Sequence, residues 1–91
     1  MEQPLPRNAI GEIVRQLRYK RGWTQEALAA KCEVAGCAIS RGTLAKIEAQ
    51  IRSATDIELF AIAAALEVPI PTLFPKDFAR QLRNAGWNRG N

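Results

Sequence analysis

Apolar residues recur every three or four positions along the chain, and no stretch alternates apolar with polar residues as a half-buried strand would. The first amphipathic stretch covers residues 8–22. Its apolar residues share one side of a helix: Ile10, Ile13, Val14 and Leu17. Asn8 is a suitable N-cap for this helix, and Gly22 is a suitable stop after basic residues in the last turn. The pattern predicts an all-α fold that begins with this helix.

Two more helices with clear start signals follow. Thr24 is an N-cap candidate for a helix that runs on alanine and leucine as far as Gly36. Ser40 caps a short third helix, and Ile39 is expected to pack just before it. The residues expected to face inward from this helix are Leu44, Ile47 and Ile51. Those expected to face outward are Arg41, Gly42, Ala45, Lys46 and Ala49.

A fourth helix begins at a capping box formed by Thr55 and Glu58, and it is apolar on nearly all sides up to Leu66. A helix this apolar lies at the centre of a core or in an interface with a partner.

The C-terminal part holds less regular structure. The stretch VPIPTLFP allows a single helical turn, with Pro71 at its first position. One more amphipathic helix could follow, around Phe78 and Leu82. The expected organisation is a flexible arm at residues 1–7, one helical domain at residues 8–75, and a C-terminal segment at residues 76–91 with a frayed end.

Composition narrows the function. A chain of 91 residues makes one domain, and its lack of histidine excludes histidine-based catalysis and histidine metal ligands. A lone acid such as Glu48 has no paired carboxylate, nucleophile or glycine-rich phosphate loop nearby in the sequence, so we expect no enzyme activity and no cofactor. The chain shows neither a membrane span nor a signal peptide, and a cytoplasmic location is expected.

Charge is unevenly distributed along the chain. Residues 7–52 hold nine basic and four acidic residues, residues 53–67 hold three acidic residues and no basic one, and residues 68–91 hold four basic and one acidic. The two basic parts could bind a polyanion. The alternative is that these charges cluster by chance on a solvated surface.

Two cysteines lie five positions apart. Cys32 and Cys37 have no histidine or further cysteine to complete a four-ligand zinc site, so no metal is expected. Buried apolar thiols are the favoured interpretation, although Cys37 could lie on an exposed link with a redox role.

The ordered set of segments LRYKRGWTQEALAAK, ISRGTLAKIE and ELFAIAAALEVPIPTLF resembles the Cro/C1-type helix-turn-helix (XRE) family of phage repressors and bacterial regulators. The resemblance extends from about Ile10 to Phe74. It implies a compact five-helix, lambda-repressor-like DNA-binding domain, here with an extra C-terminal helix. The implied function is sequence-specific binding of double-stranded DNA by a transcriptional regulator, mostly a repressor, which inserts the helix starting near Ser40 into the major groove.

The resemblance also assigns roles to single residues. Base contacts are implied for Arg41, Gly42, Thr43 and Lys46. Phosphate contacts are implied for Thr24, Gln25 and Ser40, and Arg52 is a further phosphate candidate. Arg18 and Glu48 match a pair that the family joins by an orienting ion pair, with two exposed helix charges as the alternative.

Several of these positions admit a second interpretation. Gly42 could allow close approach to DNA, or it could answer a steric demand within the protein. Thr43 could offer its methyl group to a thymine or bond its own helix. Arg15, Lys20 and Arg21 are generic phosphate candidates or solvated charges, and Arg7 could belong to an arm that follows the DNA.

The sequence departs from the family between its second and third helices. The usual turn is three or four residues long, whereas residues 33–39 make a link about five residues longer than the family's common spacing between these two helices. Either the second helix extends or the link forms a loop. Large polar residues are also scarce on the outward face of the third helix, so DNA shape could supply part of the specificity.

Small members of the family bind near-palindromic operators as homodimers, and a homodimer is expected here. The expected interface comprises the fourth helix, the PIPTLF turn and four C-terminal residues: Phe74, Phe78, Leu82 and Trp87. The alternative for these residues is an intramolecular core. The alternative function is a protein-interaction module of the same fold, antitoxin-like or oligomerising, since Gly42, Ala45 and Ala49 make a smooth surface.

Overall fold

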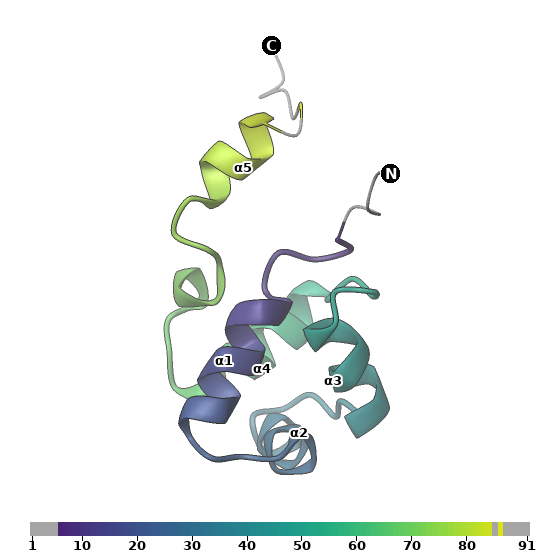
Figure 1. The fold of residues 1–91 in the computed structure, drawn as a ribbon. Helices are drawn as coiled ribbons and strands as arrows, with labels where there is room; N and C mark the ends of the chain where they lie inside the picture. Colours follow the sequence, from purple (N-terminus) through teal and green to yellow (C-terminus); the bar gives the residue numbers. More distant parts are fainter. Residues whose placement is uncertain (1–5, 85, 87–91) are drawn as a thin grey trace.

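The computed structural model describes residues 6–84 and 86, and this part of the chain is helical (Figure 1). Its elements are α1 (Gly11–Lys20), α2 (Gln25–Val34), α3 (Arg41–Glu48), α4 (Asp56–Leu66), the 3-10 helix η1 (Ile70–Leu73) and α5 (Phe78–Asn84). The predicted all-α class is confirmed, and so is the additional helix near the C-terminus. None of the helices in the described ranges has the length and apolar character needed to cross a bilayer.

The caps expected from the sequence set three of the helix starts. The Thr24 side chain accepts a hydrogen bond from the Ala27 N–H, and the Ser40 side chain accepts one from the Thr43 N–H. Thr55 and Glu58 form the expected capping box of α4. Each cap satisfies an N–H group that has no partner within the helix, which fixes where the helix begins.

The start of α1 differs slightly from the expectation. The N-cap position is Ile10, which has no side-chain cap. Asn8 performs this task from two residues upstream, because its Oδ1 accepts hydrogen bonds from the N–H groups of Ile10 and Gly11. The 3-10 helix also begins one residue earlier than expected, at Ile70, so Pro71 is its second residue.

The core lies where α1, α2, α3 and α4 meet, with η1 closing it against α1 and α4. Its largest fully buried side chains come from all five of these elements: Val14, Leu28, Cys32, Leu44, Ile47, Ile62, Leu66 and Leu73. Burying an aliphatic side chain of this size contributes roughly 1.5–3 kcal/mol. In Figure 1, α5 lies at the opposite end of the molecule from α2 and carries no buried residue.

The expectation that Ile51 faces inward is wrong. Helix α3 ends at Glu48, and Gln50 adopts a left-handed conformation with φ of 63°, which turns the chain away from the helix axis. Ile51 is therefore 66% exposed. Ile39, by contrast, is buried just before α3 as expected.

Candidate nucleic-acid interface

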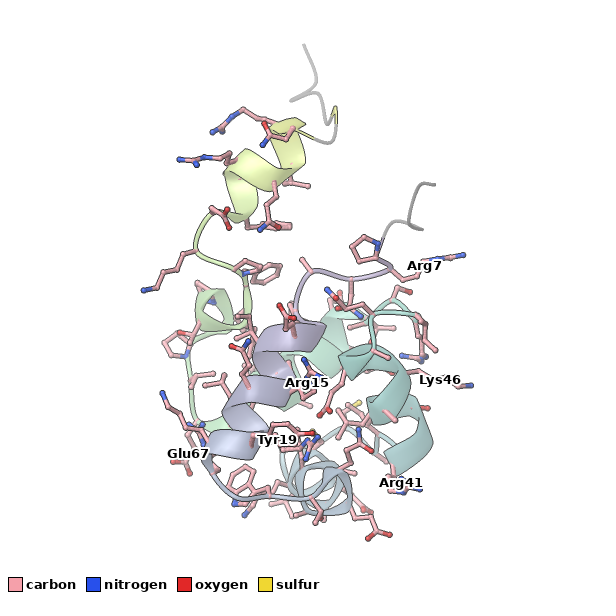
Figure 2. All side chains as sticks on the ribbon, in the orientation of Figure 1. Arg7, Arg15, Tyr19, Arg41, Lys46 and Glu67 are labelled. Atoms are coloured by element: carbon pink, nitrogen blue, oxygen red, sulfur yellow. The ribbon has the colours of Figure 1, made fainter. Side chains whose placement is uncertain are left out.

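Helix α3 has a buried side that packs on the core and an exposed side. Leu44, Ile47 and Glu48 are buried and hold the helix against the core. Arg41, Gly42, Lys46 and Ala49 are exposed, while Thr43 and Ala45 are half-buried. Figure 2 shows Arg41 and Lys46 projecting from α3 along one edge of the molecule. Both cations are thus available to a partner that approaches this edge.

Gly42 has no neighbour that would exclude a side chain. A Cβ atom at this position would come no closer than 4.0 Å to the Ser40 Oγ. The steric alternative for this glycine is therefore wrong. A residue that costs a helix about 1 kcal/mol relative to alanine stands here although the described residues leave room for a Cβ atom.

Ser40 and Thr43 bond to each other at the start of α3. The Ser40 Oγ accepts from the Thr43 N–H at 3.1 Å, and its hydroxyl donates to the Thr43 Oγ1 at 3.1 Å. The Thr43 Oγ1 thus has a partner in the N-cap residue of its own helix, in line with the second interpretation of this residue.

The Arg18–Glu48 ion pair implied by the resemblance is formed and buried. Arg18 Nε donates to Glu48 Oε2 at 2.8 Å, and Arg18 Nη2 donates to Glu48 Oε1 at 2.9 Å. The pKa of the Arg18 guanidinium is raised, mainly by the hydrogen bond to Glu48, against the opposing effect of burial. Two parallel charge-assisted hydrogen bonds fix orientation as well as distance, so α1 holds the last turn of α3 in one position.

Glu48 also holds the start of α2. Gln25 Nε2 donates to Glu48 Oε1 at 3.1 Å, and Arg18 Nη1 donates to the Trp23 carbonyl at 2.8 Å. One carboxylate therefore connects α1, α2 and α3. The amide nitrogen of Gln25 carries two hydrogens, and this contact uses one of them.

An open hollow lies between the start of α2 and the start of α3. Its lining residues are Arg18, Tyr19, Thr24, Gln25, Glu26 and Arg41. Backbone N–H groups in the first turn of α2 and the Arg41 guanidinium suit an anionic oxygen here, while the Glu26 carboxylate opposes one. The hollow thus brings together Thr24 and Gln25 with Arg41, which are seventeen or sixteen positions apart in the sequence.

The sequence patterns did not single out Tyr19. Its side chain is 65% exposed at the rim of this hollow, and the Arg18 guanidinium lies 4.7 Å from its ring centroid. An exposed aromatic beside an ion-paired arginine is a signal that only the folded structure supplies.

Arg52 has a different partner from the one expected. Its guanidinium donates to both carboxylate oxygens of Glu58, at 2.9 and 3.2 Å, and to the Ser53 carbonyl. The pKa of Glu58 is lowered, chiefly by the hydrogen bond from Arg52. The same carboxylate accepts from the Thr55 N–H in the capping box. Arg52 therefore stabilises the start of α4 in the DNA-free protein, and its phosphate contact stays a prediction.

The other basic residues in and just after α1 face different directions. Arg15 lies 3.8 Å from Glu12 on the helix surface. Arg21 donates to the Leu66 carbonyl at 2.7 Å, at the end of α4. Lys20 is exposed and lies about 200° around the helix from Arg18, at 3.6 residues per turn, so it points away from α3.

The long link between α2 and α3 is a loop. Helix α2 ends at Val34, Gly36 has a φ of 114°, and the Cys37 N–H donates to the Cys32 carbonyl at 3.1 Å. Cys32 is fully buried, and desolvation raises the pKa of its thiol to about 11. A buried protonated thiol is a poor nucleophile, so Cys32 serves as an apolar core residue. Cys37 is a half-buried free thiol packed against the core.

The apolar residues expected at a dimer interface divide between two places. Phe74 packs against the core and lies 5.2 Å from the Phe78 ring, measured between ring centroids. Phe78 and Leu82 line a groove beside Ala9 and Ile13 of the N-terminal part. Trp87 lies outside the described residues. On α4, Ile57 and Phe60 are 64% and 58% exposed.

Comparison with known proteins gives one match. A family model described as helix-turn-helix matches residues 14–73, which include α2, the link and α3. Searches of curated proteins and of solved structures returned no significant match.

Proposed function

Since the chain belongs to the Cro/C1-type helix-turn-helix (XRE) family of DNA-binding transcriptional regulators, we propose that it represses transcription by inserting α3 into the major groove of an operator. The observation that carries this proposal is the outward side of α3, where Arg41 and Lys46 flank a glycine that has no steric role in the protein. We further propose that it acts in the cytoplasm without enzymatic activity.

The proposed base contacts come from the exposed turn at the start of α3 and from Lys46. Arg41 is proposed to donate two hydrogen bonds to guanine O6 and N7, worth roughly 1–3 kcal/mol of discrimination against other bases. Lys46 lies one turn further along and can reach a base or a phosphate. Gly42 allows the backbone to approach the DNA closely, and the methyl group of Thr43 is left to contact a thymine.

The proposed phosphate contacts surround this helix. Thr24 and Gln25 stand at the start of α2, where free backbone N–H groups and the helix dipole favour an anion. Ser40 stands at the start of α3. The Arg18–Glu48 pair is proposed to orient α3 between these contacts rather than to touch the DNA.

We also propose a homodimer on a near-palindromic operator, with half-sites one helical turn (~34 Å) apart. The exposed Ile57 and Phe60 of α4 support an interface on that helix. The C-terminal residues Phe78 and Leu82 are half-buried and could extend it.

A protein-interaction module of the same fold is the second candidate. The smooth surface made by Gly42, Ala45 and Ala49 favours it, because small side chains let another protein approach α3. Salt distinguishes the two functions. A DNA reader with 6–10 phosphate contacts loses roughly 10³–10⁵ in affinity from 50 to 200 mM salt, whereas an apolar protein contact barely responds.

The experiment begins by selecting binding duplexes from a random pool, followed by fluorescence anisotropy over a salt series. The variants are the wild type, the double change Arg41→Ala with Lys46→Ala, and Lys20→Ala as a control that removes a charge facing away from α3. We expect the double change to abolish preference for the selected duplex while weak, salt-dependent binding to arbitrary duplexes survives. Equal binding by wild type and the double variant would contradict the proposal.

A further inference from the structure

Asn8 ties the N-terminal segment to the end of α3. Its Nδ2 donates to the carbonyls of Ile47 and Arg52, at 3.0 and 2.7 Å. Gln50 Nε2 donates to the Asn8 carbonyl at 3.1 Å. The chain that leads into α1 is therefore fixed to the last turn of α3 and to the loop that follows it.

This attachment fixes the backbone of Arg7 as well. The Arg7 N–H donates to the Gln50 carbonyl at 2.9 Å, just past the end of α3. The last residue of the predicted arm is thus hydrogen-bonded to the helical domain. Arg7 is exposed, and none of the ion pairs among residues 6–84 and 86 includes it.

Arg7 lies on the same side of the molecule as the proposed base-contacting residues Arg41 and Lys46 (Figure 2). Figure 2 shows Arg41, Lys46 and Arg7 along the same edge of the molecule, with Arg7 beyond the end of α3. At a rise of 1.5 Å per residue, Lys46 lies about 8 Å along the axis from Arg41, and Glu48, the last residue of α3, about 11 Å. Gln50, to which Arg7 is bonded, follows two residues after this end. The positive charge of Arg52 is compensated by its ion pair with Glu58. Within the described part of the chain, Arg7 therefore places an uncompensated positive charge near this end of α3.

We infer that Arg7 binds a DNA phosphate at the rim of the major groove. This inference rests on the proposed function. A helix that enters the groove by its N-terminal end leaves its C-terminal end near the sugar-phosphate backbone, too far out for a side chain to reach base edges. Arg7 therefore contributes affinity and register, and Asn8 is the positioning residue that holds it there.

The test measures the salt dependence of binding by fluorescence anisotropy, on the selected duplex and on an arbitrary one. Arg7→Ala lowers the slope of log affinity against log salt by about 1 for each bound protomer and weakens binding to both duplexes by the same factor. Arg7→Lys keeps the slope, because a phosphate contact needs charge rather than a planar fork. Lys20→Ala is the matched control and leaves the slope unchanged.

The contrary outcomes are separable. If Arg7→Ala binds DNA with the affinity and the salt slope of the wild type, the inference is overturned and the proposed function stands. A loss confined to the selected duplex, or an Arg7→Lys variant as weak as Arg7→Ala, overturns the phosphate assignment in favour of base readout. Absence of DNA binding by the wild type overturns the inference together with the proposed function.

Discussion

At the scale of single residues, a substitution at Gly42 is expected to change stability and DNA binding in opposite directions. Gly42→Ala removes the entropic cost of a helical glycine and adds a methyl group whose nearest neighbour among the described residues, apart from the adjacent residues and the helix backbone, is the Ser40 Oγ, at 4.0 Å. We expect the variant to be more stable by at most about 1 kcal/mol and to bind the selected duplex more weakly. Urea denaturation and fluorescence anisotropy measure the two effects.

A different result would change the interpretation of α3. If Gly42→Ala were more stable and bound DNA as well as the wild type, close approach of the backbone to DNA would not be needed. The small residue would then fit the protein-interaction function better.

Gly11 is the opposite case, and its role is steric. A Cβ atom at Gly11 would lie 2.2 Å from the carbonyl oxygen of Ile47, where α1 crosses the last turn of α3. Since neither backbone can retreat without moving a helix, we expect Gly11→Ala to lower the free energy of unfolding by about 3 kcal/mol. Gly42→Ala is the control, because it makes the same chemical change in open space. Similar stability of the two variants in urea would show that α1 can move away from the last turn of α3 at little cost.

At the scale of elements, α4 ends in an unusual way. Glu67 takes the left-handed conformation, with φ of 58° and ψ of 45°, at a position where glycine is common. We expect Glu67→Gly to raise the free energy of unfolding by about 1 kcal/mol, because it relieves the clash between Cβ and backbone. Thermal unfolding followed by circular dichroism measures it.

Gln50 provides the contrast, since it is also left-handed, with φ of 63°. Its side chain donates to the Asn8 carbonyl, so Gln50→Gly loses a contact while it relieves strain. We expect this variant to be no more stable than the wild type. A gain equal to that of Glu67→Gly would mean that the contact with Asn8 contributes nothing.

The start of α4 makes stability depend on pH. Arg52 and the Thr55 N–H bond the ionised form of Glu58 and lower its pKa below the ordinary value of 4.5. A carboxylate with a lowered pKa stabilises the fold at neutral pH, and this contribution disappears as pH falls below about 4.5 and through its folded pKa. Glu58→Gln should therefore show a smaller loss of stability than the wild type over this acidic range. The free energy of unfolding in urea, measured as a function of pH, tests it, and parallel curves would contradict the assignment.

The elements themselves were largely predictable from the sequence. Apolar spacing and the caps at Thr24, Ser40 and Thr55 depend only on residues close together in the chain, and the structure keeps all three. The helical period, continued through Gln50, predicts the wrong side for Ile51, because a left-handed conformation has no reliable sequence signal in a residue other than glycine.

The candidate site was predictable only where a family pattern or local rule existed. The resemblance supplied the buried Arg18–Glu48 pair. The Arg52–Glu58 pair, the contacts of Asn8 and the tight crossing at Gly11 depend on segments that meet only in the folded chain. No spacing rule indicates them.

At the scale of the whole molecule, the exposed apolar residues of α4 make assembly testable. We expect sedimentation at micromolar concentration to show a dimer for the wild type and a monomer for Phe60→Asp, because a buried carboxylate without a partner is costly. Phe78→Asp tests the C-terminal contribution separately. A wild-type monomer would contradict the dimer, and a dimeric Phe60→Asp would move the interface away from α4.

The buried side of helix α3 packs on the core, and its exposed side carries the proposed DNA contacts. Leu44, Ile47 and Glu48 carry its attachment to the rest of the protein, and the outward positions carry almost none. Substitutions at Arg41 or Lys46 therefore leave the fold intact, and under the proposed function operator preference can drift over generations without passing through variants that fail to fold. Under the same proposal, this separation makes the small domain a suitable starting scaffold for proteins that bind chosen DNA sequences.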